Sequence, residues 1–273
     1  MWTEEDILAL QGHARQLRRD VVTMIHLAGD GHPGPALSVA DLVAALYFKA
    51  MRVNPADPQW AARDRFILSK GHACPTLYAA LARRGFFSPE VLPTLRRLGS
   101  ILQGHPDMKK TPGIDTTSGS LGNGISIGLG MALAARVNQQ EYFTYVITGD
   151  GEIQEGVVWE AAMAAVHYKA GRLIVFVDNN GQQSGGPVRQ VSGLYPIRPK
   201  WEAFGWRCQE IDGHDLRAIL AAIELAQAET DRPSCILART VKGKGIPFME
   251  ADNSWHKRVP TKDELDQALA VLA

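Results

Sequence analysis

Two short polar clusters, each directly after an apolar run of strand length, constrain the fold of this chain most strongly. Residues 142–148 are β-branched and aromatic, as in a buried strand, and lead into Gly149-Asp150-Gly151. Residues 173–177 form a continuous apolar run, closed shortly afterwards by Asn179-Asn180. A helical pattern over residues 157–168 separates the two runs, which predicts a βαβ crossover between parallel strands. Both polar clusters should then lie at the carboxyl edge of the sheet, where open α/β sheets bind ligands.

The chemistry of these clusters suits a diphosphate bound through a divalent metal ion. Asp150 offers a carboxylate and Asn180 an amide oxygen, both hard ligands that suit Mg²⁺ alongside phosphate oxygens. The start of the intervening helix directs free N–H groups to the same place, which favours an anion. Either cluster alone is an ordinary turn sequence. The ordered combination, with 27 residues between the two clusters, is much more specific.

The composition of the chain limits the classes of protein to which it can belong. With 273 residues, of which 45% are hydrophobic, the chain is long enough for one large α/β domain over residues 1–273. The formal net charge is zero and no basic stripe is present, so we expect no nucleic-acid partner. We find neither a signal-peptide layout nor an apolar run of membrane-spanning length, and we expect no membrane association. Three scattered cysteines without a CxxC pair favour a reducing, cytoplasmic setting.

The rest of the chain alternates helical and strand-like segments, which predicts an α/β fold with a parallel sheet flanked by helices. Helices are expected from a capping box at residues 3–6 to about residue 28, over 38–48, from 75 to near 85, in a short segment following 88–90, over 124–136 and 215–228, and after a cap at 261–264. Strands are expected over 65–69, 206–211 and 233–241. Residues 29–35 are expected to form a loop rich in glycine and proline. Residues 99–124 form a polar, glycine-rich connection that is too long for a simple joint, which indicates a functional segment.

Four of the eight histidines lie in loops rich in glycine and proline or in irregular segments, rather than on helical faces. These are His32, His72, His105 and His256. Imidazole titrates near neutral pH, so it suits proton transfer and hydrogen bonding to substrate hydroxyls. His72 follows the strand predicted at residues 65–69, which places it at the same sheet edge as Asp150. A zinc site built from the four is disfavoured, because their spacings are wide and no cysteine or HExxH motif accompanies them.

The remaining histidines are interpreted as structural or surface residues. They are His13, His26, His167 and His214.

Several motifs, in the same order along the chain, resemble those of the transketolases from about residue 13 to residue 260. The motifs are GHPG at 31–34, LSKGHA at 68–73, GHP at 104–106, TSGSLG at 117–122, GDGEIQEG at 149–156, NN at 179–180, KWEAFGW at 200–206 and ARTVKGKG at 238–245. The resemblance implies the thiamine-diphosphate-binding fold, in its diphosphate-binding domain. It also implies a thiamine diphosphate cofactor with Mg²⁺, or with Ca²⁺ or Mn²⁺ in its place.

The resemblance assigns roles to the loop histidines and to the polar clusters. The four histidines would line the channel over the thiazolium ring, bind ketose hydroxyls and assist proton transfers, and His72 would also contact the cofactor. Asp150, Asn180 and the backbone carbonyl of Gln182 would hold the metal ion, with Asn180 also contacting the cofactor. Gly151 would lie against the diphosphate.

Three further positions are implied by the same resemblance. Gly119 and Leu121 would support the bent cofactor near its aminopyrimidine ring. Glu155 would bind in the cofactor region and join a carboxylate network that reaches across a subunit interface.

The chain also departs from the family pattern. Lys257 follows His256 where glycine is common in the family. Within residues 180–200, Gly185 and Tyr195 stand where acidic residues are common in the family. Lys242 and Lys244 leave two interpretations open, a phosphate-binding site and a solvated strand end.

A complete transketolase is more than twice as long, and its second domain binds the aminopyrimidine ring. The resemblance therefore implies the N-terminal subunit of a split transketolase, whose pyrimidine-binding and C-terminal domains lie on a separate chain. The partner would be a C-terminal transketolase subunit, and two such pairs would form a heterotetramer. The implied reaction transfers a two-carbon ketol unit from a ketose, or ketose phosphate, to an aldose acceptor.

Other functions stay open. Pentose-phosphate metabolism is the default setting, and a specialised sugar or secondary-metabolite pathway is an alternative. The α-subunit of a 2-oxo-acid decarboxylating complex would share the GDG unit, but the GHPG and KGHA loops argue against it. A non-catalytic regulatory subunit would not need the four loop histidines.

Overall fold

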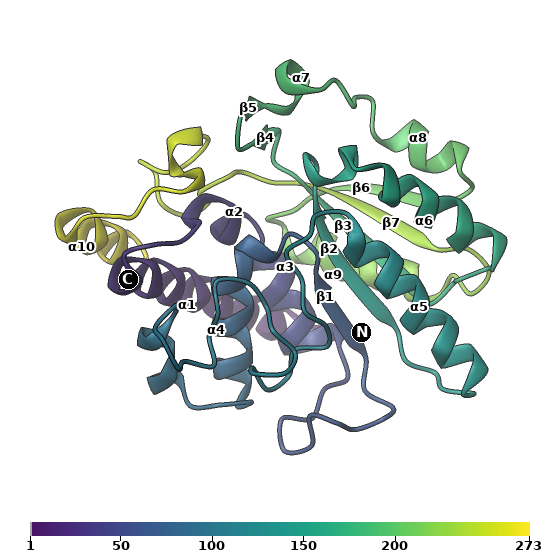
Figure 1. Cartoon of the computed structure of the whole chain (residues 1–273), viewed down its shortest axis with the longest axis horizontal. Coiled ribbons are helices and arrows are strands. Elements are labelled where there is room, and N and C mark those ends of the chain that lie inside the picture. The colour runs from purple at the N-terminus through teal and green to yellow at the C-terminus, as the bar shows by residue number, and fades with distance from the viewer. Residues whose placement is uncertain (1) are drawn as a thin grey trace.

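A five-stranded parallel sheet forms the centre of the computed structural model, which describes residues 2–273 (Figure 1). The strand order is β1-β2-β3-β7-β6, and each neighbouring pair is parallel. The strands are β1 (Arg65–Leu68), β2 (Thr144–Gly149), β3 (Leu173–Asn179), β6 (Arg207–Asp212) and β7 (Ser234–Arg239). A separate antiparallel pair consists of β4 (Gln182–Gln183) and β5 (Gly186–Pro187). The prediction of a parallel α/β fold is confirmed, as is the βαβ crossover through the two polar clusters.

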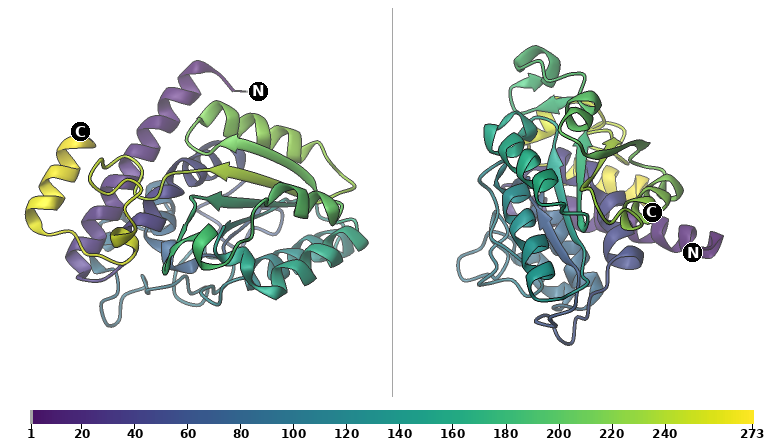
Figure 2. Two further views of the ribbon diagram at one scale, coloured as in Figure 1. Left: turned by 90° about the horizontal axis from the view of Figure 1, so that it is seen from above. Right: turned by 90° about the vertical axis from the view of Figure 1, so that its right-hand side faces the viewer.

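Helices cover both faces of the sheet, because its central strands are apolar on both faces (Figure 2). Along β2, Tyr145 and Ile147 pack in one core cluster and Val146 in the other, as the alternation of side chains along a strand requires. The first cluster includes residues of α1 (Glu4–Ala28), α3 (Ala40–Ala45), α4 (Cys74–Arg84), α9 (Leu216–Gln227) and α10 (Lys262–Val271). The second includes residues of α5 (Asn123–Val137), α6 (Gly156–His167) and α8 (Arg198–Ala203).

Local sequence signals set the ends of the first and last helices. The side chain of Thr3 accepts a hydrogen bond from the backbone of Asp6, and that of Thr261 accepts one from Glu264. In both helices the acidic side chain in turn accepts a hydrogen bond from the backbone N–H of the capping threonine, which completes a capping box. The predicted starts of these helices are confirmed.

The expectation of a loop at residues 29–35, followed by a helix capped near Ser38, is wrong. Helix α2 (Pro33–Ser38) begins at Pro33, whose fixed φ and missing N–H suit the first turn of a helix. A helix α3 and a π-helical turn, η1 (Leu46–Ala50), follow it. Ser38 does not cap a helix, because its hydroxyl donates a 2.7 Å hydrogen bond to Asp178 of β3. Hydrogen bonding to the sheet thus replaces the local cap.

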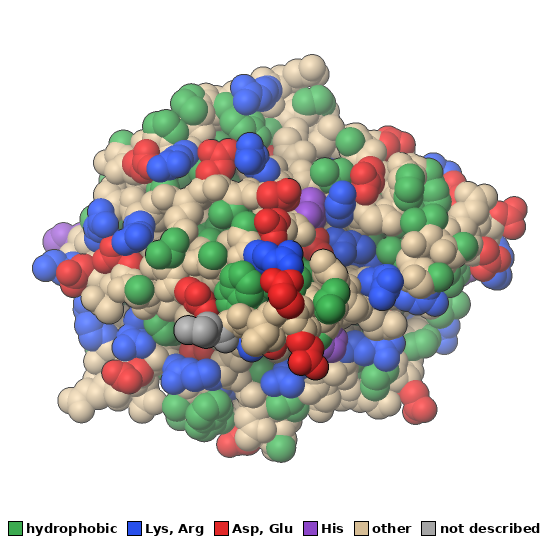
Figure 3. All heavy atoms as spheres, turned by 180° about the vertical axis from the view of Figure 1, so that it is seen from behind, with side chains coloured by type: hydrophobic (Ala, Val, Ile, Leu, Met, Phe, Trp, Pro, Cys, Tyr) green, Lys and Arg blue, Asp and Glu red, His purple; other side chains and the backbone are tan. Residues whose placement is uncertain are grey.

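Short helical turns complete the structure and carry several loop residues. They are η2 (Gly71–Ala73), η3 (Pro89–Thr94), η4 (Glu152–Gln154), α7 (Val188–Val191) and η5 (Asn253–His256). Within residues 2–273, none of the helices is both long and apolar enough to span a membrane. Acidic and basic side chains are interspersed over the face shown in Figure 3, in line with the zero formal net charge.

Candidate active site

One pocket, with a volume of about 520 Å³, lies where the segments following β1, β2, β3 and β7 converge. Every residue predicted from the sequence to form the site lines it. These residues are His32, His72, His105, Gly119, Leu121, Asp150, Gly151, Glu155, Asn180, Gln182 and His256. The parallel sheet explains the convergence, since all its strands end at the same edge.

Three of the histidines form a compact cluster. The ring centroids of His32 and His72 are 5.2 Å apart, and the ring of His256 is 5.5 Å from each of them. His105 reaches the pocket from the long connection and lies against Gly119. Gly119 has a φ of +138°, and a Cβ atom there would come within 2.9 Å of the His105 ring. Glycine at position 119 is therefore what allows this close approach.

Burial keeps these histidines neutral. It lowers the pKa of His72 to about 2, assisted by the charge of Lys70. Burial likewise lowers the pKa of His256 to about 3, with Lys242 adding to it, and that of His32 to about 4. The pKa of His105 is lowered in the same direction by burial and by Arg96. At neutral pH these rings are therefore hydrogen-bond donors and acceptors rather than cations.

Acid is accordingly expected to destabilise the fold through this cluster. Below about pH 6.5 each of these histidines binds a proton in the unfolded chain but resists it in the folded chain, so falling pH favours unfolding. The free energy of unfolding should fall by roughly 1 kcal/mol or less per histidine and pH unit, because partial exposure lets water screen the charge. Urea unfolding between about pH 5 and pH 7.5 measures the slope, which should be shallower in His72→Gln. An unchanged slope in that variant contradicts the assignment.

Lys242 is buried beside His256, with only 1% of its surface exposed. Its Nζ atom lies 2.7 Å from Asn253 Oδ1 and 2.9 Å from His256 Nδ1. Because an ammonium only donates hydrogen bonds, Nδ1 of His256 accepts and Nε2 carries the ring proton. Burial, followed by the charge of Lys70, lowers the pKa of Lys242 to about 8. The interpretation of a solvated strand end is therefore wrong for Lys242. Lys244 is partly exposed, and its Nζ atom lies 3.6 Å from Glu250 Oε1.

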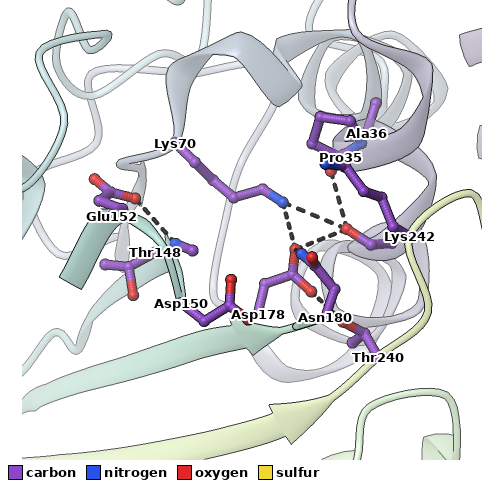
Figure 4. Close-up of polar contacts among 12 residues, drawn as sticks. Pro35, Ala36, Lys70, Thr148, Asp150, Glu152, Asp178, Asn180, Thr240 and Lys242 are labelled. Carbon is purple, nitrogen blue, oxygen red and sulfur yellow. Dashed lines mark hydrogen bonds and ion pairs between the residues drawn. The ribbon is translucent and has the colours of Figure 1, made fainter. Parts of the chain in front are cut away.

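The Asp150 carboxylate is buried at the end of β2 (Figure 4). Its two oxygens accept hydrogen bonds from the backbone N–H groups of Gly151, at 2.8 Å, and Gly181, at 2.6 Å. Burial, together with the nearby charge of Asp178, raises the pKa of Asp150 to about 7. Asn180 donates to Asp178 at 3.0 Å, and its side-chain oxygen accepts the backbone N–H of Gln182. The two polar clusters are thus in contact across the sheet edge, as predicted.

These groups fit a hard divalent cation. The oxygen Oε1 of Gln182 is buried without a hydrogen-bond partner among the described residues. Burial and the charge of Asp178 raise the pKa of Asp150, so a cation beside this carboxylate would stabilise its ionised form. Within residues 2–273, no three His, Cys, Asp or Glu side chains are placed to hold a metal ion together. A cation here would therefore depend on one carboxylate, neutral oxygens and an anionic ligand, as Mg²⁺ sites commonly do.

A buried ion pair at the pocket, whose lysine also lines it, was not anticipated from the sequence. Lys70 and Asp178 form a short salt bridge, and Asp178 is fully buried (Figure 4). Burial opposes ionisation of Asp178, but the charge of Lys70 and hydrogen bonds from Lys70, Thr240 and Ser38 outweigh it and lower the pKa. The available signal was an aspartate at the end of an otherwise apolar run. This pair ties β1, β3 and α2 together under the site.

Glu152 is a second residue that was missed. Its buried carboxylate accepts hydrogen bonds from the Ser69 hydroxyl and from the backbone N–H groups of Gly122, at 2.8 Å, and Gly149, at 3.0 Å. Burial raises its pKa despite these bonds. Glu152 therefore joins the GDG loop to the segment that carries Gly119. Glu155, by contrast, is exposed at the pocket, and its role in a network across an interface stays a prediction.

The histidines outside the loops have structural contacts. His214 Nδ1 is 2.7 Å from Asp41, and its Nε2 accepts the backbone N–H of Val241. His13 stacks on Phe48 with ring centroids 3.9 Å apart. His26 Nδ1 lies 2.8 Å from the carbonyl oxygen of Pro260. None of these rings lines the pocket described above.

The α/β fold of this chain is of the thiamine-diphosphate-binding class. The family model "Transketolase, thiamine diphosphate binding domain" matches residues 10–272. The chain belongs to the transketolase family, at its N-terminal, diphosphate-binding domain.

Relatives of two lengths match this chain. It is 44% identical to the 6-deoxy-6-sulfo-D-fructose transketolase subunit of a Clostridium species, covering 98% of both chains. It is 40% identical to an apulose-4-phosphate transketolase subunit of Phocaeicola vulgatus, covering 95% of this chain and 92% of that one. The crystal structure of transketolase from Campylobacter jejuni superimposes with a TM-score of 0.92 at 31% identity. That match covers 97% of this chain but only 43% of the Campylobacter chain.

Proposed function

We propose that this chain is the N-terminal subunit of a two-component transketolase that transfers a two-carbon ketol unit from a ketose donor to an aldose acceptor. The observation that carries the proposal is the convergence of four neutral histidines with the oxygen-bearing side chains of Asp150, Asn180 and Gln182 in one pocket. A regulatory subunit that only bound the cofactor would need the oxygen ligands for a cation but not the four histidines. Proton-transfer groups beside it indicate chemistry.

Different residues of this chain would hold different parts of the cofactor. Asp150, Asn180 and the backbone carbonyl of Gln182 would hold Mg²⁺, and Gly151 would lie against the diphosphate. Lys242 is buried, cationic below about pH 8 and in the same pocket, so it would add a positive charge to the diphosphate site. Gly119 and Leu121 would support the aminopyrimidine side. When bound, thiamine diphosphate supplies the carbon nucleophile that ketol transfer requires, and the protein supplies orientation and charge.

The histidines would act on the sugar. His256 presents Nε2–H as a donor, because Lys242 occupies its Nδ1 atom. His32 Nδ1 is buried and has no hydrogen-bond partner among the described residues, so it is available to a substrate hydroxyl. His72 and His105 would accept or return protons at the hydroxyls beside the bond that breaks. Their lowered pKa values keep both rings neutral, so each has one ring nitrogen that can accept a hydrogen bond from a hydroxyl.

The groups that contact the aminopyrimidine ring of the cofactor would come from a partner chain. Relatives that this chain covers nearly end to end are named as transketolase subunits. We propose a C-terminal subunit that carries the pyrimidine-binding domain and the groups that contact the aminopyrimidine ring, and a heterotetramer of two such pairs in the cytoplasm. The pentose phosphate pathway is the general setting for such a reaction. The names of these two relatives favour a second candidate, a specialised sugar pathway.

A reconstitution assay tests the proposal. The chain, its C-terminal partner, thiamine diphosphate and Mg²⁺ should together transfer ketol units from a ketose donor, and neither subunit should do so alone. His32→Asn should lower kcat by roughly 100-fold or more, as expected on losing a positioned proton-transfer or hydrogen-bonding group, with little change in cofactor affinity. His13→Asn, outside the pocket, is the matched control and should leave kcat unchanged. Absence of transfer by the wild-type pair contradicts the proposed function.

A further inference from the structure

Tyr195 lies beside the proposed cation site and has no role in the chemistry described so far. Its hydroxyl donates a 2.5 Å hydrogen bond to the side-chain oxygen of Asn179, the last residue of β3. Tyr195 does not line the active-site pocket itself, but it lines a second cavity of about 760 Å³ together with Asn179 and Asn180. Because Asn180 lines both cavities, Tyr195 supports the wall between them.

The bond from Tyr195 closes a loop over residues 179–195, and Gln154 fastens this loop to the GDG segment. Gln154 Nε2 donates to Gln183 Oε1 at 2.9 Å and to the backbone oxygen of Ser192 at 3.1 Å. The loop also donates a backbone N–H to Asp150. Side-chain hydrogen bonds thus set where the loop lies relative to the proposed metal ligand of β2.

The surroundings of Tyr195 make it a fixed, neutral donor. Burial, followed by the charge of Asp150, raises the pKa of Tyr195 to about 12, so the hydroxyl keeps its proton near neutral pH. The guanidinium carbon of Arg189 lies 4.0 Å from the ring centroid, a cation–π contact that holds the ring in place. An acidic residue, which is common in the family at this position, would instead bring a second negative charge toward Asp150.

The composition of the loop makes its position important. Residues 180–200 contain no aspartate or glutamate, so this stretch can offer a cation only neutral oxygens, such as those of Asn180 and Gln182. Mg²⁺ demands nearly ideal octahedral geometry, and a displaced neutral oxygen has no charge with which to compensate for the distance. A residue that fixes the loop should therefore affect cation affinity more than it affects the stability of the fold.

We propose that Tyr195 is a positioning residue for cofactor binding, which holds Asn179 and so sets the position of the adjacent Asn180 for Mg²⁺ and the diphosphate. This inference rests on the proposed function, because thiamine diphosphate is the ligand whose affinity is set. Arg189 acts through Tyr195, by keeping its ring in the orientation that the hydrogen bond requires. The departure from the family at position 195 thus has a role in holding the cofactor.

Titration of the full-length chain with thiamine diphosphate tests this inference without catalysis. Tyr195→Phe removes the hydroxyl but keeps the ring under Arg189. Its affinity for the cofactor with Mg²⁺ should fall about fivefold, the scale of one lost hydrogen bond, and the Mg²⁺ concentration at half-saturation should rise by a similar factor. The weaker binding in excess EDTA should not change, because it does not use the cation. General damage to the fold would weaken binding under both conditions.

Tyr142→Phe is the matched control. It removes a 3.0 Å hydrogen bond from a tyrosine hydroxyl to the carbonyl oxygen of Met131, outside the pocket, and should leave cofactor affinity unchanged. The inference is overturned if Tyr195→Phe binds the cofactor as tightly as the wild type with Mg²⁺, or if it loses the same factor with Mg²⁺ and in EDTA. It also falls, together with the proposed function, if the wild type shows no Mg²⁺-dependent binding.

A second variant tests the support that Arg189 gives to the ring. Arg189→Met should weaken Mg²⁺-dependent binding about threefold, the scale of an exposed cation–π contact. In the double variant Tyr195→Phe/Arg189→Met the loss should be close to that of Tyr195→Phe alone, because no hydroxyl is left to orient. Losses that simply add would give Arg189 a direct effect of charge on the diphosphate and would overturn its action through Tyr195.

Kinetics of the reconstituted pair separate this inference from the proposed function. In Tyr195→Phe the KM for thiamine diphosphate should rise about fivefold, and the KM for the ketose donor should stay constant. If the wild-type pair transfers no ketol units but Tyr195→Phe still weakens Mg²⁺-dependent binding, the proposed function fails and the positioning role stands. If transfer proceeds and Tyr195→Phe binds the cofactor like the wild type, the positioning role fails alone.

Discussion

Replacing Lys70 with alanine is expected to lower the free energy of unfolding by about 3–5 kcal/mol, the usual effect of removing one partner of a buried ion pair. Asp178 is fully buried, and Lys70 is the cation that offsets its charge. Without Lys70, the carboxylate would keep its hydrogen bonds from Ser38, Thr240 and Asn180 but would have to carry an uncompensated charge or take up a proton. The strands and α2 beneath the pocket should loosen together.

Urea unfolding at neutral pH measures this change, and a double variant separates charge from packing. In Lys70→Met/Asp178→Asn the two charges leave together and the amide oxygen can still accept hydrogen bonds, so most of the lost stability should return. Lys262→Ala, which breaks an exposed pair with Asp266, should have little effect. A change below about 1 kcal/mol in Lys70→Ala would contradict the importance given to this pair.

The parts of the fold that follow local patterns were predictable. The apolar runs ending in Gly149-Asp150-Gly151 and Asn179-Asn180 encode strands, and the requirement that parallel strands end at one edge brings their polar residues together. The same rule placed His72 in the pocket. The threonine capping boxes at residues 3 and 261 are local signals too, and they gave the helix starts directly.

The parts that depend on distant partners were not predictable. Lys70 and Asp178 are 108 residues apart in the chain, and nothing local to either indicates the other. Ser38 has the sequence context of a helix cap, yet the approach of β3 offers its hydroxyl a buried carboxylate instead. Lys242 lies just after β7 among polar residues, which suggests exposure, but the turn at residues 253–256 folds over it. Tertiary contacts override the local preference in each case.

Replacing Asp150 with asparagine is expected to remove Mg²⁺-dependent binding of thiamine diphosphate, with a loss of at least about 100-fold in affinity, because the variant deletes the one charged oxygen ligand of the proposed cation site. The variant should not unfold the chain. Since burial and Asp178 raise the pKa of Asp150 to about 7, ionisation of Asp150 lowers the stability of the metal-free fold above that pH. The cofactor-free variant should therefore be at least as stable as the wild type at pH 8.

Stability and binding together isolate the role of Asp150. Thermal unfolding of the cofactor-free proteins checks that Asp150→Asn keeps the fold, and calorimetric titration follows cofactor affinity. A variant that retains both its fold and its affinity would contradict the assignment of Asp150 as a metal ligand. A matched substitution of the exposed residue Asp263, at the start of α10, should alter neither property.

The most direct test of the central claim, that this chain is the diphosphate-binding half of a transketolase active site, is titration of the isolated wild-type chain with thiamine diphosphate in the presence of Mg²⁺ and again in excess EDTA. We predict saturable binding with Mg²⁺, at least about 100-fold weaker binding after chelation, and no such difference in Asp150→Asn. No binding with Mg²⁺, or binding that is indifferent both to chelation and to Asp150→Asn, would contradict the account.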